Sequence, residues 1–293
     1  MRTRAGAAGA LAAVAVAAPA SAQVPPPAPV AGNFGGGVVL APPDDPLGAG
    51  NAVIGIRAIN GKLRIEATIR GRCGGGTFPA RATLAADGRF VAKGTNRRRP
   101  EPGIRVKTTY RITGTLTASG ISDGTAKATN QIRVKGKGPV TCKSGTVAFS
   151  ARRPIGGIGT AGVAPGSRYY GVTSEKRHGA RRGIVLRVSS DGQSLTRALY
   201  GLTLKCGKLK LPDILDTPRR SLPIDGQGRV EDRIVDTFRD RRTETRVVER
   251  FSGTLGSNGA QGTLSNTERT RSRKTGKLIE TCKSGTIKWT AAP

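Results

Sequence analysis

Only one histidine, His178, is available for chemistry that needs an imidazole base. Residues 120–124 (GISDG) form a literal G-x-S-x-G motif, in which Ser122 would be the nucleophile of a hydrolase. Such a serine sits on a strand-to-helix turn and needs a histidine to remove its proton. The flanking residues here are Thr-rich and strand-like, so we interpret 120–124 as a β-turn. Neighbouring Lys and Arg residues disfavour protonation of His178, which we expect to be a solvated loop residue.

A second motif, G-x-G-x-x-G at 157–162, is the pattern of dinucleotide-binding loops. Those loops follow a strand and end at a helix N-terminus, which holds the pyrophosphate. In this chain Pro154 and Pro165 flank the motif, and no helical pattern follows it. We therefore interpret the motif as part of a linker and expect no cofactor.

Paired carboxylates could hydrolyse glycosidic bonds without a histidine. Acidic residues are concentrated in 230–249, where they alternate with arginines. Cross-strand ion pairs on an exposed sheet explain this pattern without catalysis. We therefore expect no enzyme, and a carboxylate-dependent extracellular hydrolase is the alternative. The carboxylates concerned are Glu231, Asp232, Asp236, Asp240, Glu244 and Glu249.

Charge is the feature that carries most functional weight. The chain has 49 Lys and Arg against 19 Asp and Glu, a net charge of +30. Such a field attracts anionic polymers in a salt-dependent way, whereas a basic surface without a ligand is the competing explanation. Aromatic residues make up only 4%, too few for extensive base stacking, so no dedicated nucleic-acid partner is expected. The clusters that predict a polyanion site are Arg97, Arg98, Arg99, Arg219 and Arg220.

The sequence contains an internal repeat. Residues 141–147 (TCKSGTV) recur as 281–287 (TCKSGTI), and upstream blocks match in the same order. Each copy therefore carries two cysteines. The other matching blocks are Phe34-Gly35 with Tyr170-Gly171, Asn60-Gly61 with Asp191-Gly192, Cys73 with Cys206, Asp87-Gly88 with Asp225-Gly226, 112–116 with 251–255, and Gly124-Thr125 with Gly262-Thr263.

The cysteine pairing follows from this repeat. A duplicated domain would have inherited one bond within each copy, which predicts the disulfides Cys73–Cys142 and Cys206–Cys282. Free thiols and bonds between the copies are the alternatives. No C-x-x-C spacing or histidine partner is present, so no metal site is expected.

The N-terminus predicts export. Arg2 and Arg4 precede a run of small apolar residues, and 20–22 (ASA) is a cleavage signal, so we expect cutting after Ala22 and a secreted or cell-envelope-associated protein. A buried Ala-rich helix is the alternative. No later apolar run is long enough for a transmembrane helix. The expected segments are a signal peptide (1–22), a Pro-rich spacer (23–32), the first copy (33–153), a Gly/Pro linker (154–167) and the second copy (168–293).

Each copy is predicted to be all-β. Short runs rich in β-branched residues alternate with Asn-Gly and Asp-Gly turns, as in 184–189 followed by Asp191-Gly192. This spacing predicts two tandem antiparallel β-sandwich domains, jelly-roll or immunoglobulin-like, with one disulfide each.

The second copy resembles a recurrent exported two-Cys β-sandwich repeat of high-GC bacteria. The residues that carry the resemblance are Tyr170-Gly171, Asp191-Gly192, Cys206, Gly253-x-Leu255 and Cys282 to Trp289. The first copy matches with Phe149 in place of the tryptophan. The resemblance implies the architecture and no activity.

We therefore expect an exported, non-enzymatic module that contacts an anionic cell-wall polymer or an acidic polysaccharide. Two copies on one polymer would raise avidity. A purely structural surface module with no specific ligand is a further alternative, and the sequence leaves the oligomeric state open.

Overall fold

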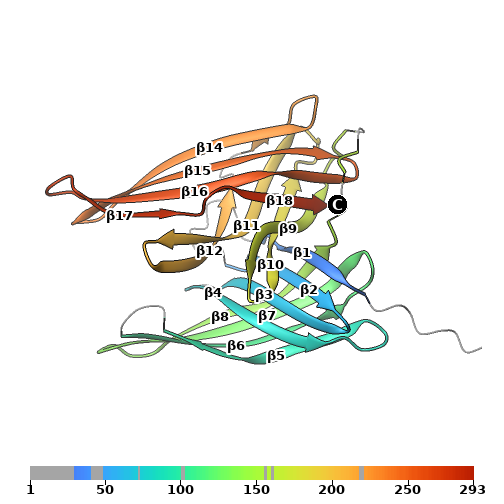
Figure 1. Cartoon of the computed structure of the whole chain (residues 1–293), viewed down its shortest axis with the longest axis horizontal. Coiled ribbons are helices and arrows are strands. Elements are labelled where there is room, and N and C mark those ends of the chain that lie inside the picture. The colour runs from blue at the N-terminus through green and yellow to red at the C-terminus, as the bar shows by residue number, and fades with distance from the viewer. Residues whose placement is uncertain are drawn as a thin grey trace, which may run out of the picture.

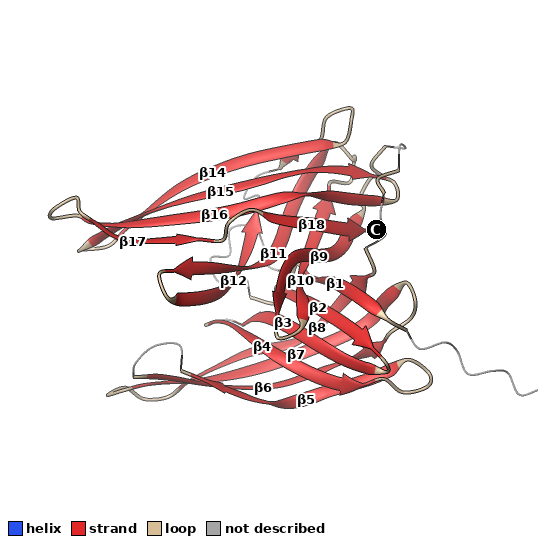
Figure 2. Cartoon of the chain, viewed as in Figure 1, coloured by secondary structure: helices blue, strands red, loops and turns tan. Residues whose placement is uncertain are grey.

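The computed structural model describes residues 30–40, 49–71, 73–99, 103–154, 157–159, 162–217 and 221–293; the side chains of 74 and 211–217 are not placed. The expected signal peptide, most of the spacer and four residues of the linker lie outside these ranges. All regular elements in the described ranges are strands (Figure 2). The predicted all-β class is therefore confirmed, and the described residues include no helix that could span a membrane.

The first copy is one antiparallel sheet in the order β4-β3-β2-β1-β8-β7-β6-β5. Neighbours in the sheet are consecutive in the chain except where β1 pairs with β8, so the chain follows a meander. Its strands are β1 (Gly32–Val38), β2 (Ala52–Ile59), β3 (Lys62–Gly71), β4 (Gly74–Thr83), β5 (Arg89–Arg98), β6 (Ile104–Thr115), β7 (Gly120–Val134) and β8 (Val140–Arg152).

The second copy repeats this arrangement in the order β12-β11-β10-β9-β18-β16-β15-β14, with β13 and β17 paired beside it. Its strands are β9 (Arg168–Arg177), β10 (Ala180–Val188), β11 (Ser194–Cys206), β12 (Leu209–Thr217), β13 (Leu222–Pro223), β14 (Arg229–Arg239), β15 (Thr243–Gly256), β16 (Gly259–Ser272), β17 (Leu278–Lys283) and β18 (Ile287–Ala292).

Each sheet folds over its own core, so that its two halves form the two layers of a sandwich. In the first copy, inward side chains of β2–β4 meet those of β5–β8, and Phe78 stacks on Tyr110 with ring centroids 4.7 Å apart. In the second copy, Phe251 stacks between Tyr200 and Trp289. Alternation of apolar and polar residues along each strand produces these one-sided cores.

The two copies pack back to back through β1–β3 and β9–β11. A small apolar cluster of Val53, Val185 and Leu199 lies between them. The backbones approach so closely that a Cβ built on Gly55 would lie 1.6 Å from the carbonyl oxygen of Arg181. Figure 1 shows the resulting four layers, with β14–β16 along the upper margin and β5 and β6 along the lower one.

The strand register aligns the first strands of the two copies with an offset of one residue from the match that the sequence predicted. Gly36 pairs with Ala151 in the first copy and Gly171 with Ala291 in the second. Phe34 therefore corresponds to Tyr169, not to Tyr170. Both Phe34 and Tyr169 are core residues, and the Tyr169 hydroxyl donates to the carbonyl of Gly256.

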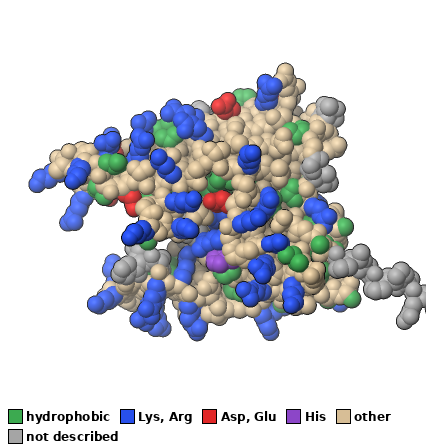
Figure 3. Space-filling view, in the orientation of Figure 1, with side chains coloured by type: hydrophobic (Ala, Val, Ile, Leu, Met, Phe, Trp, Pro, Cys, Tyr) green, Lys and Arg blue, Asp and Glu red, His purple; other side chains and the backbone are tan. Residues whose placement is uncertain are grey.

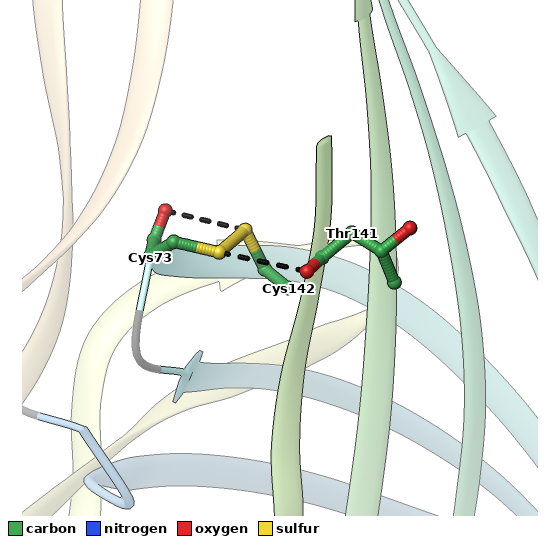
Figure 4. The surroundings of a disulfide bond; sticks show 3 residues. All are labelled: Cys73, Thr141 and Cys142. Carbon is green, nitrogen blue, oxygen red and sulfur yellow. Dashed lines mark hydrogen bonds between the residues drawn. A yellow bond between two sulfur atoms is a disulfide. The ribbon is translucent and has the colours of Figure 1, made fainter. Parts of the chain in front are cut away.

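Both predicted disulfides are confirmed. Cys73, at the β3–β4 turn, is bonded to Cys142 in β8, and their Cα atoms are 5.5 Å apart (Figure 4). Cys206 and Cys282 are bonded across a pair of adjacent strands, β11 and β17. In the first copy the bond therefore ties the β3–β4 turn in one layer to β8 in the other. In the second copy it ties β11 to β17 in the same way.

Candidate polyanion-binding surface

The predicted arginines at 97–99 lie at the end of β5, and strand pairing places further cations beside them. Arg97 is opposite Lys107 on β6, and Lys107 is opposite Gln131 on β7. In the next row along the strands, Arg105 is opposite Arg133. Together these residues line a groove of about 410 Å³, whose lining is Arg97, Arg98, Arg99, Arg105, Val106, Lys107, Gln131 and Arg133.

A third cationic row lies further along the same face. Successive side chains on a strand point to opposite faces, so every second residue shares a face. Lys93, Arg111 and Lys127 are directly opposite one another across β5, β6 and β7, and all three are exposed. We define the first cationic face as Lys93, Arg97, Arg99, Arg105, Lys107, Arg111, Lys127 and Arg133; between its rows lie Thr95, Thr109 and Thr129.

No described carboxylate forms an ion pair with any residue of the first cationic face. Of the described acids of this copy, Glu66 is buried at the boundary between the copies, and Asp87 and Asp123 bond to nearby residues near turns. Like charges directly opposite each other on a sheet are destabilising. The face therefore carries an uncompensated positive potential that an anion would relieve.

The side chain of Arg98 lies on the face of β5 opposite to that of Arg97 and is half-buried. Burial lowers its pKa, and the nearby positive charge of Arg177 in the second copy lowers it further. The Nε atom of Arg98 is buried without a hydrogen-bond partner. Arg98 thus extends the positive region from the groove toward the boundary between the copies.

The equivalent strands of the second copy also expose cationic rows. Arg233 is opposite Arg250, and Arg246 is opposite Arg269. Between these rows lie uncharged residues, as in the first copy. We define the second cationic face as five exposed arginines: Arg233, Arg246, Arg250, Arg269 and Arg271. The adjacent Arg239 is left out because Glu244 neutralises it through an ion pair of 2.6 Å. The predicted cluster Arg219-Arg220 lies outside the described residues.

His178 is an exposed turn residue, as the sequence suggested, but it also has a partner in the other copy. It turns the chain between β9 and β10 with φ 49°, and its Nδ1 atom lies 2.8 Å from Oε2 of Glu66, a residue of the first copy. The Glu66 side chain is 1% exposed, and Arg177 Nε lies 3.7 Å from its other oxygen. Sequence reasoning missed this contact because the partners are 112 positions apart and no local pattern links them.

Arg182 is a second buried charge between the copies. Its guanidinium donates to the carbonyl of Leu202, to Thr203 and, across the boundary, to Thr68. Glu175 lies 4.0 Å from it, and burial raises the pKa of this carboxyl, an effect that Arg182 partly offsets. These bonds satisfy a guanidinium that is 1% exposed, so its role is structural.

The other candidates for chemistry are dispersed. Residues 120–124, predicted to form a β-turn, instead begin strand β7, where Ser122 is exposed at a strand irregularity and lies in a different copy from His178. The acids of 230–249 divide between the two faces of β14 and β15, because Glu231 and Asp232 alternate from exposed to buried. Among the described residues, one acid and two sulfurs come together as Cys206, Glu280 and Cys282, but both sulfurs are in a disulfide.

Comparison with family models, with curated proteins and with solved structures finds no match for this chain.

Proposed function

We propose that this chain is an exported, non-enzymatic protein that associates electrostatically with anionic polymers of the cell envelope or the extracellular space. The observation that carries the proposal is the first cationic face, where eight Lys and Arg side chains share one sheet surface without an acidic neighbour among the described residues.

The chemistry of this face suits repeated anionic groups. Arginine presents a planar fork of donors that binds phosphate or carboxylate through two hydrogen bonds. Along the strand, Arg99 lies six steps beyond Lys93, which is roughly 20 Å at 3.3–3.4 Å per step. A single small anion covers a fraction of that length, whereas a polymer can contact every row.

Export is supported by the N-terminal pattern and by two disulfides, which persist in oxidising compartments. The same N-terminal segments and the resemblance to exported bacterial repeats support an envelope location. Binding at an envelope or in the extracellular space would place the cationic faces among teichoic-type phosphates or acidic polysaccharides.

Co-sedimentation of the mature chain with purified cell wall across a salt series tests the proposal. We expect retention that falls steeply with salt and exceeds that of an unrelated protein of equal net charge. Retention equal to that of the control would overturn the proposal, because the charge would then be surface composition alone.

A further inference from the structure

The two cationic faces lie on opposite sides of the molecule. The layers follow one another as β5–β8, β1–β4, β9–β12 and β14–β18, because each core joins two layers and β1–β3 pack on β9–β11. The outer surfaces of the first and last layers therefore point away from each other. In Figure 3 basic side chains project from both the upper and the lower margin.

The separation of the faces is large compared with electrostatic screening. Packed sheets are about 10 Å apart, so four layers separate the two faces by about 30 Å. The Debye length at physiological salt is about 8 Å. The faces therefore act as independent charges, and one stiff polymer that lies along one face does not reach the other.

The repeat preserves the cationic rows while the residues themselves differ. The pair Lys93 and Arg111 in the first copy corresponds to Arg233 and Arg250 in the second. The row that contains Arg97 and Lys107 occupies the same place in its sheet as the row that contains Arg246 and Arg269. Uncharged residues separate these rows in both copies. Two sheets of one chain thus present the same spacing of positive charge outward.

We propose that the chain is a cross-linker with two polyanion-binding faces, which holds one linear anionic polymer on β5–β7 and a second on β14–β16. This inference rests on the proposed function and goes beyond it, because simple retention on a polymer needs only one face. The inference also replaces the expectation that both copies raise avidity by binding a single polymer. Avidity requires that both sites reach the same ligand, and faces on opposite sides of the molecule do not reach one stiff polymer.

Binding stoichiometry tests the inference. Short polyphosphate chains and short polygalacturonate chains, long enough to cross one face but not to pass around the molecule, are titrated into the mature chain in a calorimeter. We expect two chains per protein for the polymer whose anion the faces prefer. The two polymers separate phosphate from carboxylate as the source of charge.

Three matched variants, each lacking four cations, assign the sites. The first replaces Arg97, Arg99, Arg105 and Arg133 with Gln; the second replaces Arg233, Arg246, Arg250 and Arg269; the control replaces Arg57, Lys62, Lys208 and Lys210, exposed cations of the inner layers. Each face variant should bind one chain, and the control variant should bind two. Circular dichroism verifies that all three are folded.

Cross-linking is read from light scattering with long-chain polyphosphate. The unmodified chain and the control variant should form large assemblies near charge equivalence that dissolve in excess polymer, whereas each face variant should give small soluble complexes. A stoichiometry of one for the unmodified chain, or equal scattering by all variants, would overturn the cross-linking inference and leave the proposed function standing. Absence of binding to either polymer would overturn both.

Discussion

The imidazole Nδ1 of His178 lies 2.8 Å from the carboxylate Oε2 of Glu66, and this contact joins the two copies. It closes the boundary where β3 meets the β9–β10 turn. The fixed placement of the two cationic faces depends on this boundary, because rotation of one copy against the other would redirect the faces. The stability of the boundary is therefore the first property to test.

Replacement of Glu66 by Gln should weaken the boundary. The carboxylate is 1% exposed, its Oε2 lies 2.8 Å from His178 Nδ1, and Arg177 Nε lies 3.7 Å from its other oxygen. Glutamine keeps an acceptor oxygen but removes the charge, and a hydrogen bond to a charged group contributes about 1.5–3 kcal/mol. His178 is 42% exposed, so water replaces part of the lost contact. Guanidinium denaturation should report this loss, and the exposed Glu231→Gln should change the unfolding free energy by less than about 0.5 kcal/mol. Equal effects of both variants would contradict the assignment.

Replacement of Gly55 by Ala should force the copies apart. The new Cβ would lie 1.6 Å from the carbonyl oxygen of Arg181, an atom of the opposing backbone. We expect a loss of about 3 kcal/mol or more, since backbone must move. Gly138→Ala is the control, because a Cβ there has no neighbour within 4 Å. Thermal unfolding and small-angle scattering measure stability and shape; unchanged values for Gly55→Ala would show that the copies are not packed this way.

Each disulfide should stabilise its own copy. The bonds close segments of 69 and 76 residues, and constraint of the unfolded chain on that scale is worth about 4 kcal/mol before strain is considered. The double variant Cys73→Ser with Cys142→Ser should lose about 2–4 kcal/mol in denaturant unfolding. Reductant should reproduce the effect in the unmodified chain. Insensitivity of the unmodified chain to reductant would contradict a structural role.

Acid should destabilise the fold through aspartates near turns. Asp123 accepts hydrogen bonds from the backbone N–H and the hydroxyl of Thr115, and these bonds lower its pKa below the usual 3.8. A depressed pKa in the folded state means stability that is present above about pH 4 and is lost as pH falls through the folded pKa. Denaturation at successive pH values should show this loss, reduced in Asp123→Asn. An identical pH profile for that variant would contradict the assignment.

The sequence predicted the features that depend on local pattern or on the repeat. Alternating apolar residues with Asp-Gly turns predicted strands, and the repeat predicted the bond between Cys73 and Cys142. The contact of Glu66 with His178 could not be predicted, because it depends on how two sheets pack. The cationic rows required strand register: Arg97 is visible as part of a run, but Arg133 joins it in one groove only when β5, β6 and β7 pair.

The most direct test of polyanion binding is the salt dependence of polyphosphate affinity in the face variants. Each phosphate contact that is lost lowers the slope of log affinity against log salt by about 0.7–0.9. Replacement of Arg97, Arg99, Arg105 and Arg133 by Gln should reduce the slope for the first face by about 3. The matched control, which lacks Arg57, Lys62, Lys208 and Lys210, should keep the slope of the unmodified chain. Equal slopes for the two variants would mean that binding follows net charge and that the cationic faces are not binding surfaces.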